Sequence, residues 1–427
     1  MNNRLLTERV HYYAPAIHIG MAVTIAGEPT SEEMKAAIRK ALAQHEIFSS
    51  RVVMNEQGEG YYERISEPVL QIEERINSEE EEWKRIIYEQ ERIPFRFHEG
   101  ELIRFFLLRK EAVLQLVVVA HHLSGDGLAM IYLIRDIMEA LGNPEIDRKQ
   151  LPIRLCTKED FPKESKISPQ LRLMVRLFNG QWKRKGRIFS YEDYLSMFHQ
   201  YWSKRTTSIV NGYISGDELK KLLLLCKQHH ITMNSAITTA FSMAIKCEKE
   251  IGLAVNVRPE GYEGMGNFAS GISFEYEPDF NLSFWDNALR IQEELHKRIR
   301  QSKKKYFVFQ FMGSMEPTLI DALYFQVFGD YQNSTAKIFS DMFRYSGNPR
   351  GIGISNLTKL DIPELYGKYT ITHLDFVPPV VANARRLIGV ATLGDTMSIT
   401  MNSEDQGNKE IREQELEATI RLLKSLT

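Results

Sequence analysis

The sequence has 427 residues, of which 43% are hydrophobic and 26% are charged, as in ordinary globular proteins. This length allows two lobes of about 200 residues each, and cores of that size need neither disulfides nor a structural metal. The formal net charge is −2 and the pI is about 6.6. Because nucleic-acid-binding domains are usually strongly basic, this balance gives no case for a nucleic-acid partner.

The cysteines and the N-terminus indicate the compartment. Cys156, Cys226 and Cys247 are far apart and form no CxxC pair, so we expect neither a zinc site nor a disulfide framework, and a reducing compartment fits best. The first 15 residues contain no apolar signal-peptide core. The longest apolar run, residues 114–120, is far shorter than the roughly 20 residues that span a bilayer. The sequence therefore predicts a cytoplasmic protein with no membrane span and no metal.

The first 150 residues alternate between helix-like and strand-like patterns. In chain order we expect a helix at 30–46, an extended segment at 47–54, an acidic helix at 78–92, strands at 101–108 and 113–120, and a helix at 127–141. Thr30 and Glu33 form a capping-box pattern, and Pro94 would stop the acidic helix. The short gap between the two apolar strands predicts an antiparallel pair.

The remaining residues predict a crossover and a second lobe. Residues 151–205 are rich in proline and mixed charge, with one amphipathic piece at 171–182. After them we expect helices at 215–225 and 232–245, a strand at 251–257, one long helix at 281–305, strands at 369–377, 387–393 and 397–401, and a helix at 409–423. We therefore predict an α+β fold with an N-terminal lobe at 1–150, a crossover at 151–205 and a C-terminal lobe at 206–427.

Residues 117–127 place two histidines, which can act as acids or bases, at the end of a predicted strand. A strand runs into His121 and His122, followed by Gly125-Asp126-Gly127 and a helix. A neutral imidazole at a strand end can take a proton from an attacking hydroxyl or amine. Consecutive strand residues point to opposite faces, so the two histidines are poorly placed to share a metal ion. The spacing alone favours a surface pair or a structural cap over a catalytic pair.

The pattern His121-His122-x-x-x-Asp126-Gly127 resembles the HHxxxDG signature of the chloramphenicol acetyltransferase-like superfamily. That superfamily includes the condensation domains of nonribosomal peptide synthetases, alcohol acyltransferases, polyketide-associated acyltransferases and wax ester synthases. Further segments resemble the family's motifs in the family's order: residues 45–52 (HExLRxRF), 93–104 (PFDLxxGPLLR), 231–234 (gvTvn), 256–259 and 266–268 (lRP…GNF), and 354–357 (vSNlG).

The sequence departs from the family's pattern at four places. Ser49 replaces the first arginine of HExLRxRF, Arg96 replaces the aspartate of PFD, and Thr358 replaces the glycine after SNL. A DFGWG motif is missing, and residues 374–376 are its nearest trace. This last departure puts the family's usual latch contact of the second lobe in doubt.

The resemblance implies two chloramphenicol acetyltransferase-like lobes in a V with a tunnel between them. His122 would point into the tunnel as the general base, and no acyl-enzyme would be required. Asp126 would pair with Arg51 and hold the loop, with His121 and Gly127 as structural residues of the site.

The resemblance also suggests where the tetrahedral oxyanion would be bound. The backbone N–H of Gly127 is one candidate donor. Ser355 and Asn356, from the second lobe, are candidate oxyanion or tunnel residues, as is Asn267.

The function that follows is acyl transfer from a thioester to a hydroxyl or amine on a small-molecule acceptor, with no permanently bound cofactor. Our main expectation is an acyl-CoA donor. The first alternative is a condensation enzyme that takes a phosphopantetheinyl thioester from an acyl- or peptidyl-carrier protein in trans. The second is a catalytically silent binding protein. Basic clusters at 183–187 and 303–305 are either solvated helix ends or contacts for coenzyme A phosphates or an acidic carrier protein.

Overall fold

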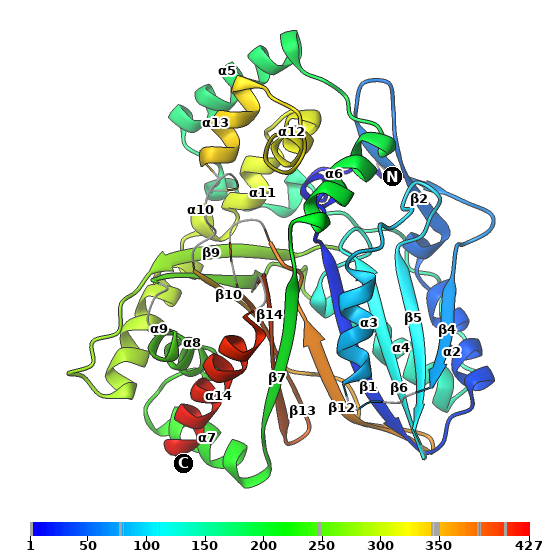
Figure 1. The fold of residues 1–427 in the computed structure, drawn as a ribbon, viewed down its shortest axis with the longest axis vertical. Helices are drawn as coiled ribbons and strands as arrows, with labels where there is room; N and C mark the ends of the chain where they lie inside the picture. Colours follow the sequence, from blue (N-terminus) through cyan, green and yellow to red (C-terminus); the bar gives the residue numbers. More distant parts are fainter. Residues whose placement is uncertain are drawn as a thin grey trace.

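Two six-stranded sheets lie side by side, and helices pack against both (Figure 1). The computed structural model describes residues 3–427 apart from 77–78, 80, 111, 246–248, 343–344, 346–350, 382–383, 385 and 405–407. Cys247 therefore lies outside the described residues. The arrangement confirms the predicted α+β fold with two sheet-bearing lobes.

The first sheet has the strand order β11-β12-β1-β6-β5-β4. Its strands are β1 (His18–Ala26), β4 (Gln71–Ile76), β5 (Ile103–Lys110), β6 (Val113–His121), β11 (Leu365–Tyr366) and β12 (Tyr369–Val377). The β5–β6 pair is antiparallel, as the two apolar runs predicted. β12 pairs with β1, so a segment from the C-terminal part of the chain completes the first sheet. A separate hairpin joins β2 (Ser50–Met54) to β3 (Gly60–Arg64).

The second sheet has the order β7-β14-β13-β10-β8-β9. Its strands are β7 (Thr207–Ser215), β8 (Glu250–Asn256), β9 (Ala269–Glu275), β10 (Ile352–Lys359), β13 (Arg386–Leu393) and β14 (Thr396–Glu404). Asp375 on β12 accepts hydrogen bonds from Ser398 on β14 at 2.6 Å and from Tyr213 on β7 at 3.3 Å. The trace of the missing DFGWG motif thus lies at a contact between the two sheets.

Most of the helices form three groups. In chain order they are α1 (Arg9–Tyr12), α2 (Ser31–Ala43), α3 (Glu82–Gln90), α4 (Gly127–Gly142), α5 (Pro169–Lys185), α6 (Tyr191–Ser203), α7 (Gly216–Gln228), α8 (Met233–Ala244), α9 (Phe284–Arg300), α10 (Ser302–Lys305), α11 (Phe307–Met312), α12 (Pro317–Phe328), α13 (Ser334–Met342) and α14 (Lys409–Ser425). The first group, α2 to α4, accompanies the first sheet, and α7, α8, α9 and α14 cover the second (Figure 1). The crossover helices α5 and α6 gather with α11 to α13 at the top of Figure 1. No helix in the described part of the chain is both long and apolar enough to cross a membrane.

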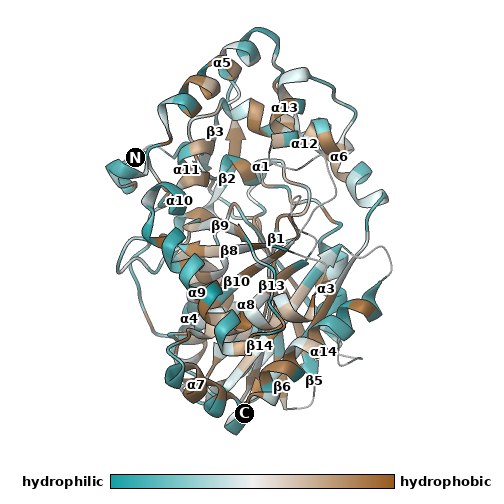
Figure 2. Cartoon of the chain, turned by 90° about the vertical axis from the view of Figure 1, so that its left-hand side faces the viewer, coloured by the Kyte–Doolittle hydropathy of each residue, from teal (hydrophilic) through white to brown (hydrophobic). Residues whose placement is uncertain are grey.

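Local sequence signals explain where several helices begin. Thr30 and Glu33 form the predicted capping box at the start of α2, and Ser283 forms another at α9. Such caps satisfy backbone N–H groups that a helix cannot bond internally. Figure 2 shows the apolar strands in the interior and hydrophilic helix faces outside, as on α9. Each sheet thus buries an apolar face beneath amphipathic helices.

Three predicted elements differ from the structure. Residues 46–49 form a 3₁₀ turn before β2, so the extended segment is shorter than expected. The acidic helix begins at Glu82, and residue 78, its predicted start, lies outside the described residues. The predicted helix at 281–305 is interrupted because Gln301 adopts an extended conformation (φ −86°, ψ 96°). After this break, α10 contacts β9.

Candidate active site

The histidine pair lies at the end of β6, where the chain turns toward α4. His121 is fully buried and packs against the rings of Phe97 and Phe95, at centroid distances of 5.5 and 5.7 Å. Its Nδ1 accepts the backbone N–H of Leu123 at 3.1 Å. Burial is the main cause that lowers the pKa of His121 well below 6.5, with smaller contributions from His18, His122 and Arg104. His121 is therefore a neutral part of the core.

His122 points to the other side and contacts the second lobe. Its Nδ1 lies 2.5 Å from Oδ1 of Asn267, and Nδ2 of Asn267 donates to the His122 carbonyl at 2.6 Å. A carbonyl oxygen can only accept, so the second bond fixes the amide with its oxygen toward the ring. Nδ1 must then carry the proton. The lone pair of His122 is left on Nε2, which is the form that a general base requires.

A third histidine covers the ring of His122. The imidazole of His11 stacks on it with a centroid distance of 4.3 Å and an interplanar angle of 17°. Burial, together with the nearby His122 and His121, lowers the pKa of His11 well below 6.5. Burial also lowers the pKa of His122, while Asp126 and Asn267 oppose that shift. Both stacked rings are therefore expected to be neutral at pH 7.

Asp126 holds the loop after His122 through three hydrogen bonds. Its carboxylate accepts from the Arg258 guanidinium at 2.7 Å and from the backbone N–H groups of Phe268 at 2.8 Å and Ala129 at 2.9 Å. The Ala129 bond caps the start of α4. The Asp126 and Arg258 side chains are only 4% and 3% exposed. The loop is thus fixed both to its own helix and to the second lobe.

The predicted pairing of Asp126 with Arg51 is wrong. Arg51 lies on β2 of the hairpin, is 44% exposed, and pairs with Glu63 on β3 at 2.6 Å. A side chain on the outer side of this hairpin faces solvent, so it does not reach the loop. The structural role expected of Asp126 is kept, but its partner comes from the other lobe.

The glycines of the loop stand where other atoms come close. A Cβ on Gly125 would lie 2.6 Å from the Cβ of Ala129, and one on Gly127 would lie 3.0 Å from the Leu357 side chain and 3.1 Å from the Phe376 ring. The loop can pack closely against α4, β10 and β12 because these Cβ atoms are absent. Gly127 also begins α4, where helix N–H groups favour negative charge.

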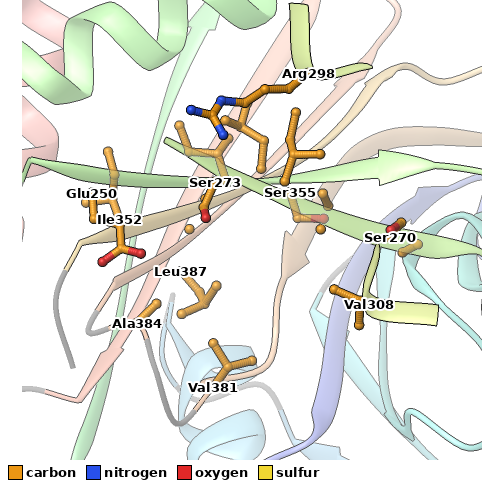
Figure 3. A pocket seen from close by; sticks show the side chains of 18 of the residues that line it. Glu250, Ser270, Ser273, Arg298, Val308, Ile352, Ser355, Val381, Ala384 and Leu387 are labelled. Atoms are coloured by element: carbon orange, nitrogen blue, oxygen red, sulfur yellow. The ribbon is translucent and has the colours of Figure 1, made fainter. Parts of the chain in front are cut away.

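The larger of the two cavities that Val381 borders has a volume of about 620 Å³ and lies over β8, β9 and β10, below α10 and α11, and His122 is not among its lining residues. Figure 3 shows Ser273, Ser355 and Leu387, from strands of the second sheet, around this cavity, with Val381 from the chain before β13. Arg298 also borders it, and Lys304 supplies a second cation from the basic cluster on α10. The lining is mainly apolar, with Arg298 and Lys304 as its basic residues and Glu250 as an acidic one.

The smaller cavity, of about 140 Å³, is bordered by His11 and Ile17. Ile17 accepts the backbone N–H of His122 at 3.2 Å. Val381 borders both cavities, which places them side by side.

The candidate second-lobe residues have different positions. Ser355 lines the larger cavity, whereas Asn267 contacts His122. The amide of Asn356 bonds Asn234 at 3.3 Å and accepts the backbone N–H of Thr358 at 2.7 Å. Across the described residues, no cluster of three or more His, Cys, Asp or Glu side chains could hold a metal ion.

Sequence reasoning missed His11 and the role of Arg258. His11 lies in a segment for which we predicted no element, and only the fold brings it to His122. Arg258 was available as part of the Asn256–Pro259 motif, but nothing in its spacing identified its partner 132 residues away.

The N-terminal part of the sequence matches a known protein family. Residues 4–150 match the family model of the condensation domain. A polyketide synthase–nonribosomal peptide synthetase from Aspergillus clavatus is 28% identical over 153 residues, which cover 35% of this chain and 4% of that protein. A linear gramicidin synthase chain from Brevibacillus parabrevis is 24% identical over 323 residues, which cover 69% of this chain and 6% of that protein. The chain thus spans only a small part of these curated relatives.

Solved structures match over nearly the whole chain. The first condensation domain of the calcium-dependent antibiotic synthetase has a TM-score of 0.68 at 12% identity, covering 98% of this chain and 93% of that one. Polyketide synthase associated protein 5 from Mycobacterium tuberculosis has a TM-score of 0.61 at 13% identity, covering 100% and 97%. The chain therefore has the two-lobed, chloramphenicol acetyltransferase-like fold of condensation domains, and its residues 4–150 match that family.

Proposed function

We propose that this protein forms an amide or ester by transferring an acyl group from a pantetheine thioester, presented by a carrier protein, to an amine or hydroxyl. The observation that carries this proposal is the environment of His122, a partly buried imidazole whose Nδ1–H is held by Asn267. The condensation-domain match over residues 4–150 includes this histidine, and it favours the carrier-protein donor over our first expectation of acyl-CoA.

The proposed reaction uses Nε2 of His122 as the base. As the acceptor nitrogen or oxygen attacks the thioester carbonyl carbon, Nε2 takes its proton. The tetrahedral oxyanion then collapses, the carbon–sulfur bond breaks, and the imidazolium returns the proton to the leaving thiolate. The Ser355 hydroxyl and the Gly127 backbone N–H are the candidate donors to the oxyanion. Lowering the pKa of His122 by burial keeps it unprotonated before the attack.

The acyl-CoA donor remains the second candidate because of one observation. Lys304 borders the larger cavity from a run of three lysines, and Arg298 lies at the same cavity. These cations could receive the phosphates of coenzyme A. The pantetheine arm is common to both donors, so chemistry at His122 does not separate them.

The test compares one acyl group on three donors: coenzyme A, pantetheine, and a recombinant peptidyl-carrier protein loaded enzymatically. A pool of amines and alcohols serves as acceptor, and products are identified by mass spectrometry. We expect acceptor-dependent product with the carrier-protein donor, and a loss of roughly 10² to 10⁴ in rate for His122→Ala. His229→Ala, at an exposed histidine stacked on Trp285, is the matched control and should retain activity.

Each other outcome has a defined meaning. Equal turnover of acyl-CoA and carrier-bound donor would favour the free-standing acyl-CoA enzyme. Product formation that is unaffected in His122→Ala would refute His122 as the base. Binding of the loaded carrier protein without product from any acceptor would favour the silent binding protein.

A further inference from the structure

The smaller cavity beside His11 is uncharged throughout. Its volume is about 140 Å³. Its lining residues carry no charged side chain and include His11, Ala16, Ile17, Tyr324, Phe328 and Val381. The hydroxyl of Tyr324 is already engaged, since it donates to the Val10 carbonyl at 2.7 Å. The walls are thus largely aliphatic and aromatic.

This cavity lies close to His122, the candidate base. His11 forms part of its wall and stacks on His122 at 4.3 Å, so one imidazole separates the cavity from the candidate base. Ile17, another wall residue, bonds the His122 backbone. Val381 is shared with the larger cavity. A substrate whose reacting atoms lie beside His122 would therefore have this cavity next to it, on the far side of the His11 ring.

The size and polarity of the cavity define what it can hold. An engineered apolar cavity of about 150 Å³ in another protein binds benzene, so about 140 Å³ matches one six-membered ring or a branched aliphatic group. A charged group would lose its hydration here and find no opposite charge among the lining residues, which is costly. Burial lowers the pKa of His11, so the His11 side chain is neutral at pH 7 and adds no charge to the cavity.

We propose that this cavity is a specificity subsite for a compact, uncharged side group, of phenyl or isobutyl size, carried next to the reacting atom of the substrate. This inference rests on the proposed function and adds a substrate class to it. Such a group can be carried by the acyl donor or by the acceptor, and the experiment distinguishes them.

The first test measures binding without turnover, with benzene as the probe, by ligand-observed NMR. The wild-type protein should bind benzene, and Ala16→Leu, which fills the cavity, should weaken binding at least tenfold. Ala36→Leu, the same change at an exposed position of α2, is the matched control and should bind as the wild type does. Circular dichroism checks that each variant folds. No benzene binding by the wild type, or equal binding by Ala16→Leu, would overturn the subsite.

The second test measures kcat/KM with phenylalanyl, alanyl and aspartyl groups, first on the donor and then on the acceptor. On the side that uses the cavity, phenylalanyl should exceed aspartyl at least tenfold. Ala16→Leu should lower the phenylalanyl-to-alanyl ratio, and Phe328→Leu, which enlarges the cavity, should shift preference toward a larger naphthyl group. Ratios unchanged in both variants would overturn the proposal. Benzene binding that Ala16→Leu removes, combined with no turnover of any substrate, would refute the proposed function and the substrate role while leaving an apolar ligand cavity.

Discussion

Replacing Arg258 should destabilise the protein far more than replacing Arg51. The Arg258→Met change removes the guanidinium from Asp126 and leaves a carboxylate that is only 4% exposed without its opposite charge. Breaking one side of a buried ion pair typically costs about 3–5 kcal/mol. Asp126 would keep its two backbone donors, on Ala129 and Phe268, so we expect a cost at the lower end, about 3 kcal/mol.

Arg51→Met is the matched control for this experiment. Arg51 and Glu63 are 44% and 51% exposed, and exposed ion pairs contribute at most about 1 kcal/mol. Guanidinium denaturation followed by circular dichroism measures both variants. The double variant Asp126→Asn/Arg258→Met removes both charges and should be less destabilised than the sum of the two single variants. If Arg258→Met unfolded at the wild-type denaturant concentration while Arg51→Met lost stability, Arg51 would be the partner of Asp126 and the lobe contact described above would be refuted.

Three further predictions concern other single residues. Asn267→Asp places a carboxylate beside Nδ1 of His122, so it should raise the pKa of His122 and move the acid limb of the pH–rate profile to higher pH. An unmoved limb would contradict a positioning role for Asn267. Thr358 is β-branched and adopts a φ of +62°, so Thr358→Gly should stabilise the protein by about 1 kcal/mol in the same denaturation assay, and a loss of stability would show that the backbone is not strained there. His18 is buried with a pKa of about 3, so between pH 6.5 and 3 the unfolded chain binds a proton that the native protein does not, and native stability falls as pH falls through this window. His18→Phe should therefore reduce the stability difference between pH 7 and pH 5 by about 2 kcal/mol, and an undiminished difference would place the titrating group elsewhere.

The sequence predicted features that depend on neighbouring residues. The capping box at Thr30, the antiparallel β5–β6 pair and the strand–loop–helix around His122 are each encoded within a few residues. The Thr358 departure is also explained locally, because the family's glycine occupies a position that here has a positive φ. In all these cases a short segment determines its own conformation.

Features that depend on distant residues were missed or wrong. Two arginines were available to Asp126, and the motif pattern favoured Arg51 because it belongs to a segment that resembles the family's arginine motif. Choosing Arg258 required knowing that Arg51 lies on the exposed side of a hairpin. His11 could not be predicted, since its stacking on His122 depends on how the N-terminal segment packs over the end of β6.

The residues that hold His122 suggest that its chemistry and the packing of the lobes are coupled. Asn267, which sets the protonated nitrogen of His122, is adjacent to Phe268, whose backbone N–H bonds Asp126. Arg258, which pairs with Asp126, also donates to the carbonyls of Gly264 and Gly266 in the same loop. One loop of the second lobe therefore fixes both the tautomer of His122 and the position of the loop that carries it. Changes in this loop should lower stability and activity together, whereas changes to the wall of the smaller cavity, such as Ala16→Leu, should alter substrate preference with little effect on lobe packing. Measuring stability and substrate preference for each variant therefore shows whether it disturbs the contact between the lobes or the binding site.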